Sequence, residues 1–398
     1  MKVIESIVEI AIIEARYPYK MSYLDEWLKA WKLASRNAQT FNVLNDSELK
    51  NLQKSLSKFD LIVILHSVTA DSNKWLYDLI DTLSRRKCPV ILFVGNEYSN
   101  PWLSMEKRLE NIKQINPEVI ATQLTQKSGE FLYEGLGAKV VETPHALPLR
   151  QSLSDHKIDR NLDLGFRGFD YPWYLLDSDR NVIVEEVKDY YFSSKLSVDI
   201  SKSERLDKEN WYKFLKSCKT TVASEGGSNY VFRTDEIWAE ALRYLDSVSA
   251  NKYLSNDFFG AKLLRSLPGS VKSNLRVIGK FLGKEQGATS TLSQEVLRQV
   301  LSRIDVNDYQ HVSGKALTSR HMDAICCGTW QILTPGNYNG VLTAGNHYTA
   351  WDATNPRSVL LEVEEAIKSN KSTNIYEELI QINSYQSRIN RLLDRLYS

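Results

Sequence analysis

Two basic side chains, Arg320 and His321, stand in the first turn of a predicted short helix that ends at Gly328. Thr318 or Ser319 begins this helix, because a hydroxyl there accepts a hydrogen bond from a free backbone N–H. A cation at a helix N-terminus opposes the helix dipole unless an anion binds there. The pattern therefore predicts an anion site. The alternative interpretation is that both side chains only point into solvent.

A buried strand follows that helix at once, and a glycine-rich loop follows the strand. A buried strand is predicted at 330–333, and the segment 335–340 (PGNYNG) turns tightly after it. Such a loop leaves the carboxyl end of the strand, which is where open α/β sheets bind ligands. Together the helix start and the loop predict a ligand that carries phosphate. Gly226 and Gly227 follow another predicted strand, at 220–222, and indicate a second, weaker phosphate or sugar cradle.

Polar side chains also end three predicted strands in the first part of the chain. His66 follows LIVIL, Asn96 and Glu97 follow ILFVG, and His145 follows VVETP. Because the carboxyl ends of parallel strands share one edge of a sheet, these residues are expected to line a crevice. His66 and Glu97 are candidate catalytic bases, and Asn96 and His145 are candidates for positioning the acceptor. The alternative for each residue alone is a capping or turn role.

The elements that would position these residues alternate between strand and helix. Apolar runs at 8–15, 60–65, 89–94, 119–124 and 139–141 predict the strands of a parallel, doubly wound α/β sheet over about residues 1–150. A polar linker at 151–160 precedes a second α/β domain at 161–370. Apolar residues at helical spacing predict a helical insertion in this second domain, at about 235–307. Residues 371–398 predict a C-terminal helix.

Composition excludes several classes of protein. The chain has 398 residues, a net charge of +1, 42% hydrophobic and 25% charged residues, which is typical of a globular protein of two domains. A charge so near zero argues against nucleic acid as a partner. The four cysteines are expected to be buried thiols. No signal peptide or membrane span is recognised, so we expect a cytoplasmic protein.

The segment SRHMDAICCGTWQILTPGNYNGVL, with NHYTAWD after it, resembles the donor-binding motif of bacterial GT-B-fold glycosyltransferases. The branch it resembles most is the group 1 type that includes spore-maturation glycosyltransferase-like proteins. VGNEY and PHALP resemble the first half of the same branch. The resemblance implies two Rossmann-like domains facing a cleft, with the last helix packing back on the first domain. It also implies a nucleotide-sugar donor in the second domain, an acceptor in the first, and no metal or other cofactor.

The resemblance also implies roles for individual residues. Arg320 and His321 would neutralise the leaving diphosphate, and Asp323 stands where relatives use a glutamate that reaches the ribose. Arg167 lies in a segment similar to the one that opens the donor domain, although its neighbouring glycines alone would explain a tight turn. The other implied donor-binding residues are Gly226, Gly227, Ser319, Tyr338, Asn339 and Gly340. Lys315 replaces the first glutamate of the retaining relatives, which leaves retaining and inverting chemistry both open.

These features predict a glycosyltransferase that moves a sugar from a nucleotide-sugar to a glycan, lipid-linked or protein acceptor in bacterial surface polysaccharide or glycoconjugate synthesis. The alternatives are a GT-B-like sugar-nucleotide epimerase and a non-catalytic scaffold of a polysaccharide assembly complex. Residues 258–284 hold six basic residues and no acidic one. This interval predicts peripheral contact with an anionic membrane at its inner face, against the alternative of a solvated helix face.

Overall fold

The structure is a computed structural model that describes residues 9–16, 22–98, 103–149, 159–203, 206–248, 304–352, 354–355, 357–369 and 375–398. The first part of the chain forms a six-stranded parallel sheet in the order β2-β1-β3-β4-β5-β6. Its strands are β1 (Glu9–Glu14), β2 (Asn37–Asn42), β3 (Leu61–Ile64), β4 (Val90–Phe93), β5 (Val119–Thr122) and β6 (Lys139–Glu142).

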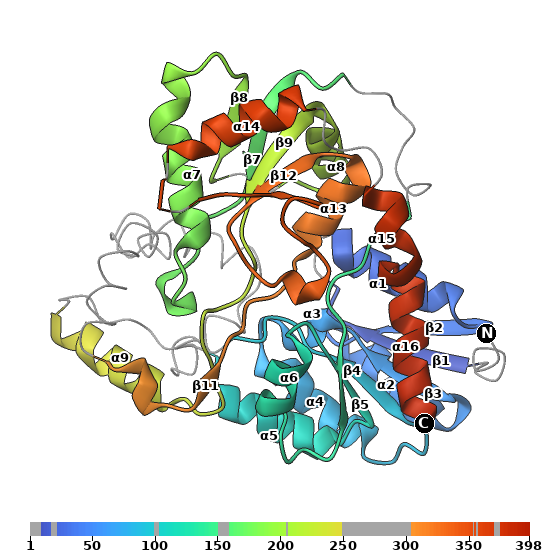
Figure 1. Cartoon of the computed structure of the whole chain (residues 1–398). Coiled ribbons are helices and arrows are strands. Elements are labelled where there is room, and N and C mark those ends of the chain that lie inside the picture. The colour runs from blue at the N-terminus through green and yellow to red at the C-terminus, as the bar shows by residue number, and fades with distance from the viewer. Residues whose placement is uncertain are drawn as a thin grey trace, which may run out of the picture.

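Both faces of this sheet are covered, because alternate residues of each strand enter different cores. Ala11 and Ile13 of β1 pack in one core, and Ile10 and Ile12 pack in the other. The first core is completed by α2 (Asp46–Ser55), α4 (Asn73–Leu83), α5 (Met105–Ile115) and α6 (Gln126–Leu132), and the second by α1 (Ser22–Leu33) and the C-terminal α16 (Tyr385–Tyr397). Figure 1 shows α16, in red, lying against this first domain.

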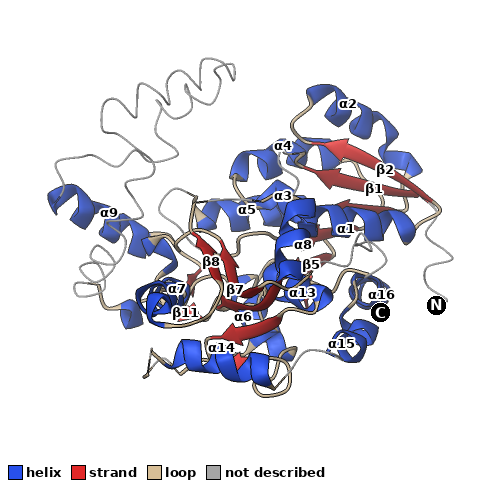
Figure 2. Ribbon diagram, turned by 90° about the horizontal axis from the view of Figure 1, so that it is seen from above, coloured by secondary structure: helices blue, strands red, loops and turns tan. Residues whose placement is uncertain are grey.

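The second part of the chain forms a five-stranded parallel sheet in the order β13-β12-β9-β7-β8. Its strands are β7 (Leu162–Arg167), β8 (Val198–Ser201), β9 (Cys218–Ala223), β12 (Trp330–Leu333) and β13 (Thr349–Ala350). One core of this domain contains residues of α8 (Lys208–Ser217), α13 (Ser319–Cys327) and α15 (Ile375–Asn383). The opposite core contains residues of α7 (Asp179–Tyr190) and α14 (Ser358–Lys368). Figure 2 shows the helices around the two sheets from above.

The two domains meet near the carboxyl ends of both sheets. Asn339, in the loop after β12, donates to the carbonyl of Gln123 after β5 (3.1 Å) and to the carboxylate of Glu142 at the end of β6 (2.9 Å). A parallel, doubly wound sheet in each domain and this boundary between them confirm the predicted fold class, a two-domain α/β architecture of the GT-B type.

A segment of the second domain also crosses to the first. The two-residue strands β10 (Val231–Phe232) and β11 (His311–Val312) pair in an antiparallel manner, and Val231 packs in the core of the first domain. Asp235 then accepts a hydrogen bond from the backbone N–H of Met105 (2.8 Å), at the N-terminus of α5. This carboxylate satisfies a free helix N–H and complements the helix dipole, so it ties the two domains together.

Some expectations fall outside the described residues. Of the expected insertion at about 235–307, the structure describes α9 (Glu236–Val248) and residues 304–307, whereas 249–303, with the basic interval 258–284, lies outside. Most of the expected linker lies outside as well. No helix in the described part of the chain is long and apolar enough to cross a membrane. All four cysteines are free and buried, as expected.

One strand of the first sheet has no counterpart in the sequence predictions. The strand β2 (NAQTFN) lies at the edge of the sheet and exposes alternate side chains. An edge strand is covered on fewer sides than a central strand, so it does not require the continuous apolar run by which the other strands were predicted.

Candidate functional site

The start of α13 is built around His321. Thr318 is the N-cap, and its backbone N–H donates to Nδ1 of His321 (3.0 Å), so this imidazole takes the place that glutamate or glutamine holds in a capping box. Because Nδ1 accepts, the proton of the neutral ring lies on Nε2. Burial lowers the pKa of His321 to about 3, with a further contribution from the charge of Arg320. Ser319, the first residue of the helix, is half-buried beside them.

Arg320 has no acidic partner among the described residues. Its Nη1 donates to the backbone carbonyl of Arg167 (2.6 Å), and its guanidinium lies over the rings of Trp211 (5.0 Å) and Phe166 (5.3 Å). Burial, with a smaller contribution from the charge of Arg180, lowers the pKa of Arg320 to about 10, and the charge of Asp323 opposes this shift. A largely buried guanidinium without a carboxylate is costly, so the site favours an anion.

Arg180, in the first turn of α7, is the second cation of this site and was not predicted. Its Nη2 donates to the carbonyl of Phe169, and its Cζ lies 3.6 Å from the ring centroid of Tyr171. Arg320 and Arg180 thus bind carbonyls only two residues apart on the turn after β7, which spans at most about 7.6 Å. Neither forms an ion pair with any residue that the structure describes. A basic residue therefore stands in the first turn of both α7 and α13, and the charges of the two residues lie near enough to affect each other.

The backbone carbonyl of Arg167 accepts from Arg320, whereas the side chain of Arg167 pairs with another residue. Its guanidinium makes a two-pronged ion pair with Asp199 of β8 (2.8 and 2.6 Å) and lies over the ring of Phe214 (4.2 Å). Such a bidentate pair satisfies the guanidinium. The carboxylate of Asp199 thus neutralises this cation, and the donor-binding role expected of Arg167 stays a prediction.

The predicted cradle at Gly226 and Gly227 is closed by the chain itself. The N–H of Gly226 donates to the carbonyl of Ala316 (2.8 Å), and the N–H of Ala316 donates back (3.0 Å). Gly227 has a φ of 90°, and a Cβ there would lie 2.0 Å from the carbonyl oxygen of Gly314. Close approach of these two backbone segments, rather than of a ligand, explains both glycines.

The glycine-rich loop after β12 likewise binds an internal anion. The carboxylate of Glu225 accepts from the N–H of Tyr338 (2.6 Å), and a Cβ at Gly336 would lie 2.4 Å from an oxygen of this carboxylate. Asn339 and Gly340 have φ angles of 54° and 65°, and the Gly340 N–H donates to the carbonyl of Asn337 (2.8 Å). The expected donor-pocket role of this loop is corrected in part, because these N–H groups already have partners within the protein.

Asn339 and Tyr338 instead connect the loop to its surroundings. Besides its contacts with the first domain, Asn339 accepts from the N–H of Leu317 (2.7 Å), just before α13. The ring of Tyr338 meets His321 edge to face at 5.1 Å, and its hydroxyl donates to the carbonyl of Thr334 (2.6 Å). Both residues therefore position the start of α13.

Asp323 lies on the face of α13 that packs against α8. Its carboxylate accepts from Nε1 of Trp211 (2.9 Å) and from the hydroxyl of Tyr212 (3.1 Å), and the residue is 4% exposed. The ribose contact implied by the resemblance stays a prediction, since both carboxylate oxygens of Asp323 already accept from aromatic side chains. Aspartate is one methylene shorter than glutamate, which suits this inward position.

Three buried histidines gather at the domain boundary. His66 begins α3 (His66–Thr69) after β3, and its ring stacks on that of His145 with centroids 6.0 Å apart. Burial lowers the pKa of His66 well below its ordinary value and that of His145 to about 4. His145 also lies close enough to His321 to lower its pKa. The structure therefore brings together one predicted donor-site residue and two predicted first-domain residues, all neutral near pH 7.

Glu97 and Asn96 have structural partners. The carboxylate of Glu97 accepts from the hydroxyls of Thr122 (2.6 Å) and Tyr133 (2.5 Å) and from the N–H of Gln123 (2.6 Å). Burial raises its pKa to about 7. Asn96 has a φ of 51° and accepts at its carbonyl from the buried Arg108 (2.7 Å). The turn role considered for Asn96 agrees with this geometry, and Glu97 holds the same loop in place.

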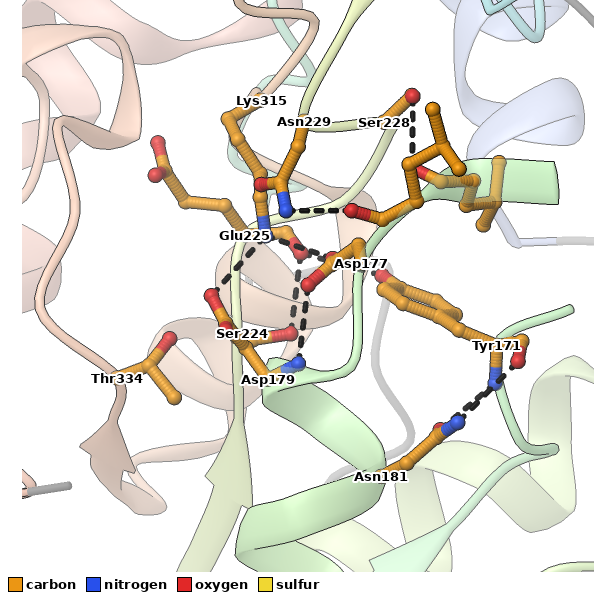
Figure 3. Close-up of polar contacts among 12 residues, drawn as sticks. Tyr171, Asp177, Asp179, Asn181, Ser224, Glu225, Ser228, Asn229, Lys315 and Thr334 are labelled. Atoms are coloured by element: carbon orange, nitrogen blue, oxygen red, sulfur yellow. Dashed lines mark hydrogen bonds and ion pairs between the residues drawn. The ribbon is translucent and has the colours of Figure 1, made fainter. Parts of the chain in front are cut away.

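A cluster of ion pairs joins Lys315 to Asp177 and Asp179 (Figure 3). Nζ of Lys315 lies 2.6 Å from Oδ2 of Asp177 and 3.1 Å from Oδ2 of Asp179. The Asp177 carboxylate also accepts from the backbone N–H of Asp179 (2.9 Å). No group of three histidine, cysteine or acidic side chains in the described residues has the arrangement of a metal site.

Comparison with known proteins gives only a weak structural likeness. No family model matches the sequence. No curated protein matches it either. Three crystal structures of HepE from Anabaena are similar in fold: with UDP and glucose (TM-score 0.47, 9% identity), with UDP (0.41, 8%) and with UDP-glucose (0.39, 8%). The match covers 98% of this chain each time, and 99%, 100% and 98% of the respective HepE chain. At these values the likeness does not assign a function, and the resemblance to the spore-maturation branch stays a prediction.

Proposed function

We propose that this protein is a glycosyltransferase that takes a nucleotide-sugar donor and transfers the sugar to a glycan, lipid-linked or protein acceptor. One observation carries the proposal: Arg320 and Arg180 converge on the turn 167–169 at two helix N-termini, without an ion-pair partner among the described residues. A diphosphate supplies the missing negative charge.

The proposed chemistry needs little beyond electrostatics. When the sugar leaves, negative charge develops on the diphosphate, and two guanidinium groups already in place stabilise that charge without reorganisation. The neutral His321 stands at the same helix start, where its fully buried ring accepts from the Thr318 N–H and holds the first turn in place. Electrostatic stabilisation by these groups supports the proposal of a transferase that works without a bound metal.

The acceptor would approach from the first domain. His66 and His145 lie at the boundary, and burial lowers the pKa of both, so both rings are neutral near pH 7. Their proposed part is to orient the acceptor rather than to hold its proton. Three hydrogen bonds within the protein occupy the carboxylate of Glu97, the other candidate base.

Nucleotide binding to charge-removing variants tests the proposal. UDP and UDP-glucose are suitable first probes, since the HepE structures contain them. Loss of a charge-assisted hydrogen bond to phosphate in Arg320→Ala or Arg180→Gln should weaken binding by about 10- to 100-fold. Arg16→Ala, which removes an exposed arginine of the first domain, is the matched control. Unchanged affinity in both site variants would refute the role of the two arginines.

A second candidate is a non-catalytic scaffold that retains the fold. It is favoured by the internal partners of Gly226, Tyr338 and Asp323, each of which occupies a group that a donor would otherwise bind. An epimerase would bind the donor and need no acceptor. Nucleotide release measured with and without candidate acceptors separates the possibilities: a transferase needs the acceptor, an epimerase changes the sugar without net release, and a scaffold does neither.

A further inference from the structure

The ion cluster of Lys315, Asp177 and Asp179 joins the two backbone segments that carry the arginines of the anion site. Asp179 is the first residue of α7 and directly precedes Arg180. Lys315 lies on the other segment, five residues before Arg320. Figure 3 shows the lysine side chain reaching from one segment to the two aspartates of the other.

The path from Lys315 to Arg320 is held by hydrogen bonds at successive residues. Ala316 pairs with Gly226 in both directions, Leu317 donates to Asn339 (2.7 Å), and Thr318 donates to His321 (3.0 Å). These hydrogen bonds fix the position of Lys315 relative to the start of α13.

The pair of Lys315 and Asp177 is shielded from solvent, whereas the side chain of Asp179 is 47% exposed. The side chain of Asp177 is fully buried and that of Lys315 is 13% exposed. Burial alone raises the pKa of Asp177, and the lysine opposes this shift. Without Lys315 the Asp177 carboxylate would be a buried charge without compensation, so the turn before α7 would have to rearrange or take up a proton.

The residue type at position 315 also depends on these aspartates. Retaining relatives implied by the resemblance have a glutamate here, and a carboxylate at 315 would face the two carboxylates of Asp177 and Asp179. Like charges at such distances repel strongly in a buried site. The positive charge of Lys315 therefore matches the two negative charges of Asp177 and Asp179.

We infer that Lys315 is a positioning residue: its ion pairs with Asp177 and Asp179 hold the first turn of α7, and with it Arg180, next to Arg320 so that both guanidinium groups reach one diphosphate. This inference rests on the proposed function, because it assigns a task to Lys315 within the same anion site. It does not require Lys315 to touch the ligand.

Binding of inorganic pyrophosphate, measured by calorimetry, tests the inference without any need for the true donor. Lys315→Met should weaken binding by about tenfold, a coupling typical of residues in one ionic network. Lys315→Arg should restore most of the affinity because it keeps the charge. Lys219→Met is the matched control, since this lysine pairs with Asp163 (2.7 Å) at the opposite, amino-terminal end of β9.

Two double variants separate positioning from direct binding and from misfolding. In an Arg180→Gln background, Lys315→Met should have little further effect if it acts through Arg180. An undiminished tenfold effect in that background would overturn the inference and make Lys315 a direct ligand. The variant Asp177→Asn with Lys315→Met leaves no uncompensated buried charge at this pair, so it should fold and still bind weakly.

Wild-type affinity in either Lys315→Met or that double variant would overturn the positioning role while leaving the proposed function intact. If the wild-type protein binds neither pyrophosphate nor UDP, there is no diphosphate site, and the proposed function fails together with the inference.

Discussion

Replacing His321 by glutamine should reduce the loss of stability at acidic pH. Glutamine at this position keeps an acceptor for the Thr318 N–H, because it is a natural capping-box residue, but it removes the titrating ring. The pKa of His321 is about 3 in the folded protein against an ordinary value of 6.5. A base whose folded pKa is lowered contributes stability that is complete above pH 6.5 and is lost as the pH falls.

The magnitude follows from the interval between the two values. Between pH 6.5 and about pH 4.5 the histidine binds a proton in the unfolded chain but not in the folded chain. The free energy of unfolding therefore falls by about 1.4 kcal/mol per pH unit, or about 3 kcal/mol over this interval. Urea denaturation of the wild type and of His321→Gln at about pH 7.5 and about pH 4.5, at equal ionic strength, measures this difference. An identical acid loss in the two proteins would mean that His321 is protonated in the folded state, which contradicts its burial.

Three further predictions concern other parts of the chain. Glu97→Gln should have the opposite effect: burial raises the pKa of Glu97 to about 7, so its contribution is present at low pH and lost as the pH rises through 7, by up to about 3 kcal/mol. A wild-type pH profile in this variant would contradict the shift. Turnover should survive EDTA, because arginines rather than a metal neutralise the diphosphate; activity lost on chelation and restored by Mg²⁺ would contradict the mechanism. The protein should sediment with anionic but not with neutral liposomes, and the bound fraction should fall as the salt concentration rises. Replacing Lys272, Arg276 and Lys280 by serine should abolish this binding. If the wild type does not bind anionic liposomes at low salt, the basic interval 258–284 is a solvated face.

Secondary structure and fold class could be predicted from the sequence because their signals are local. The apolar runs of β3, β4 and β12 reflect strands buried on both faces, and the serine–threonine start and glycine end of α13 are chemical requirements of a helix terminus. The polar edge strand β2 was missed because its environment demands no such run.

Site residues were predicted only as far as backbone position decides them. His66, His145 and His321 follow strands or begin a helix at the carboxyl edges, and parallel topology alone brings such positions together. Arg180 carries the same local signal as Arg320, a cation in the first turn of a helix, although the predictions did not single it out.

The tertiary structure alone determines how the polar groups pair with one another. Asp199 forms an ion pair with Arg167, and the carboxylate of Glu225 accepts a hydrogen bond from the N–H of Tyr338. Trp211 and Tyr212 donate hydrogen bonds to the carboxylate of Asp323. These partners are separated by 32 to 113 residues along the chain. A sequence shows that a donor or a charge is present at an edge, but burial and distance determine whether another part of the chain or a ligand satisfies it.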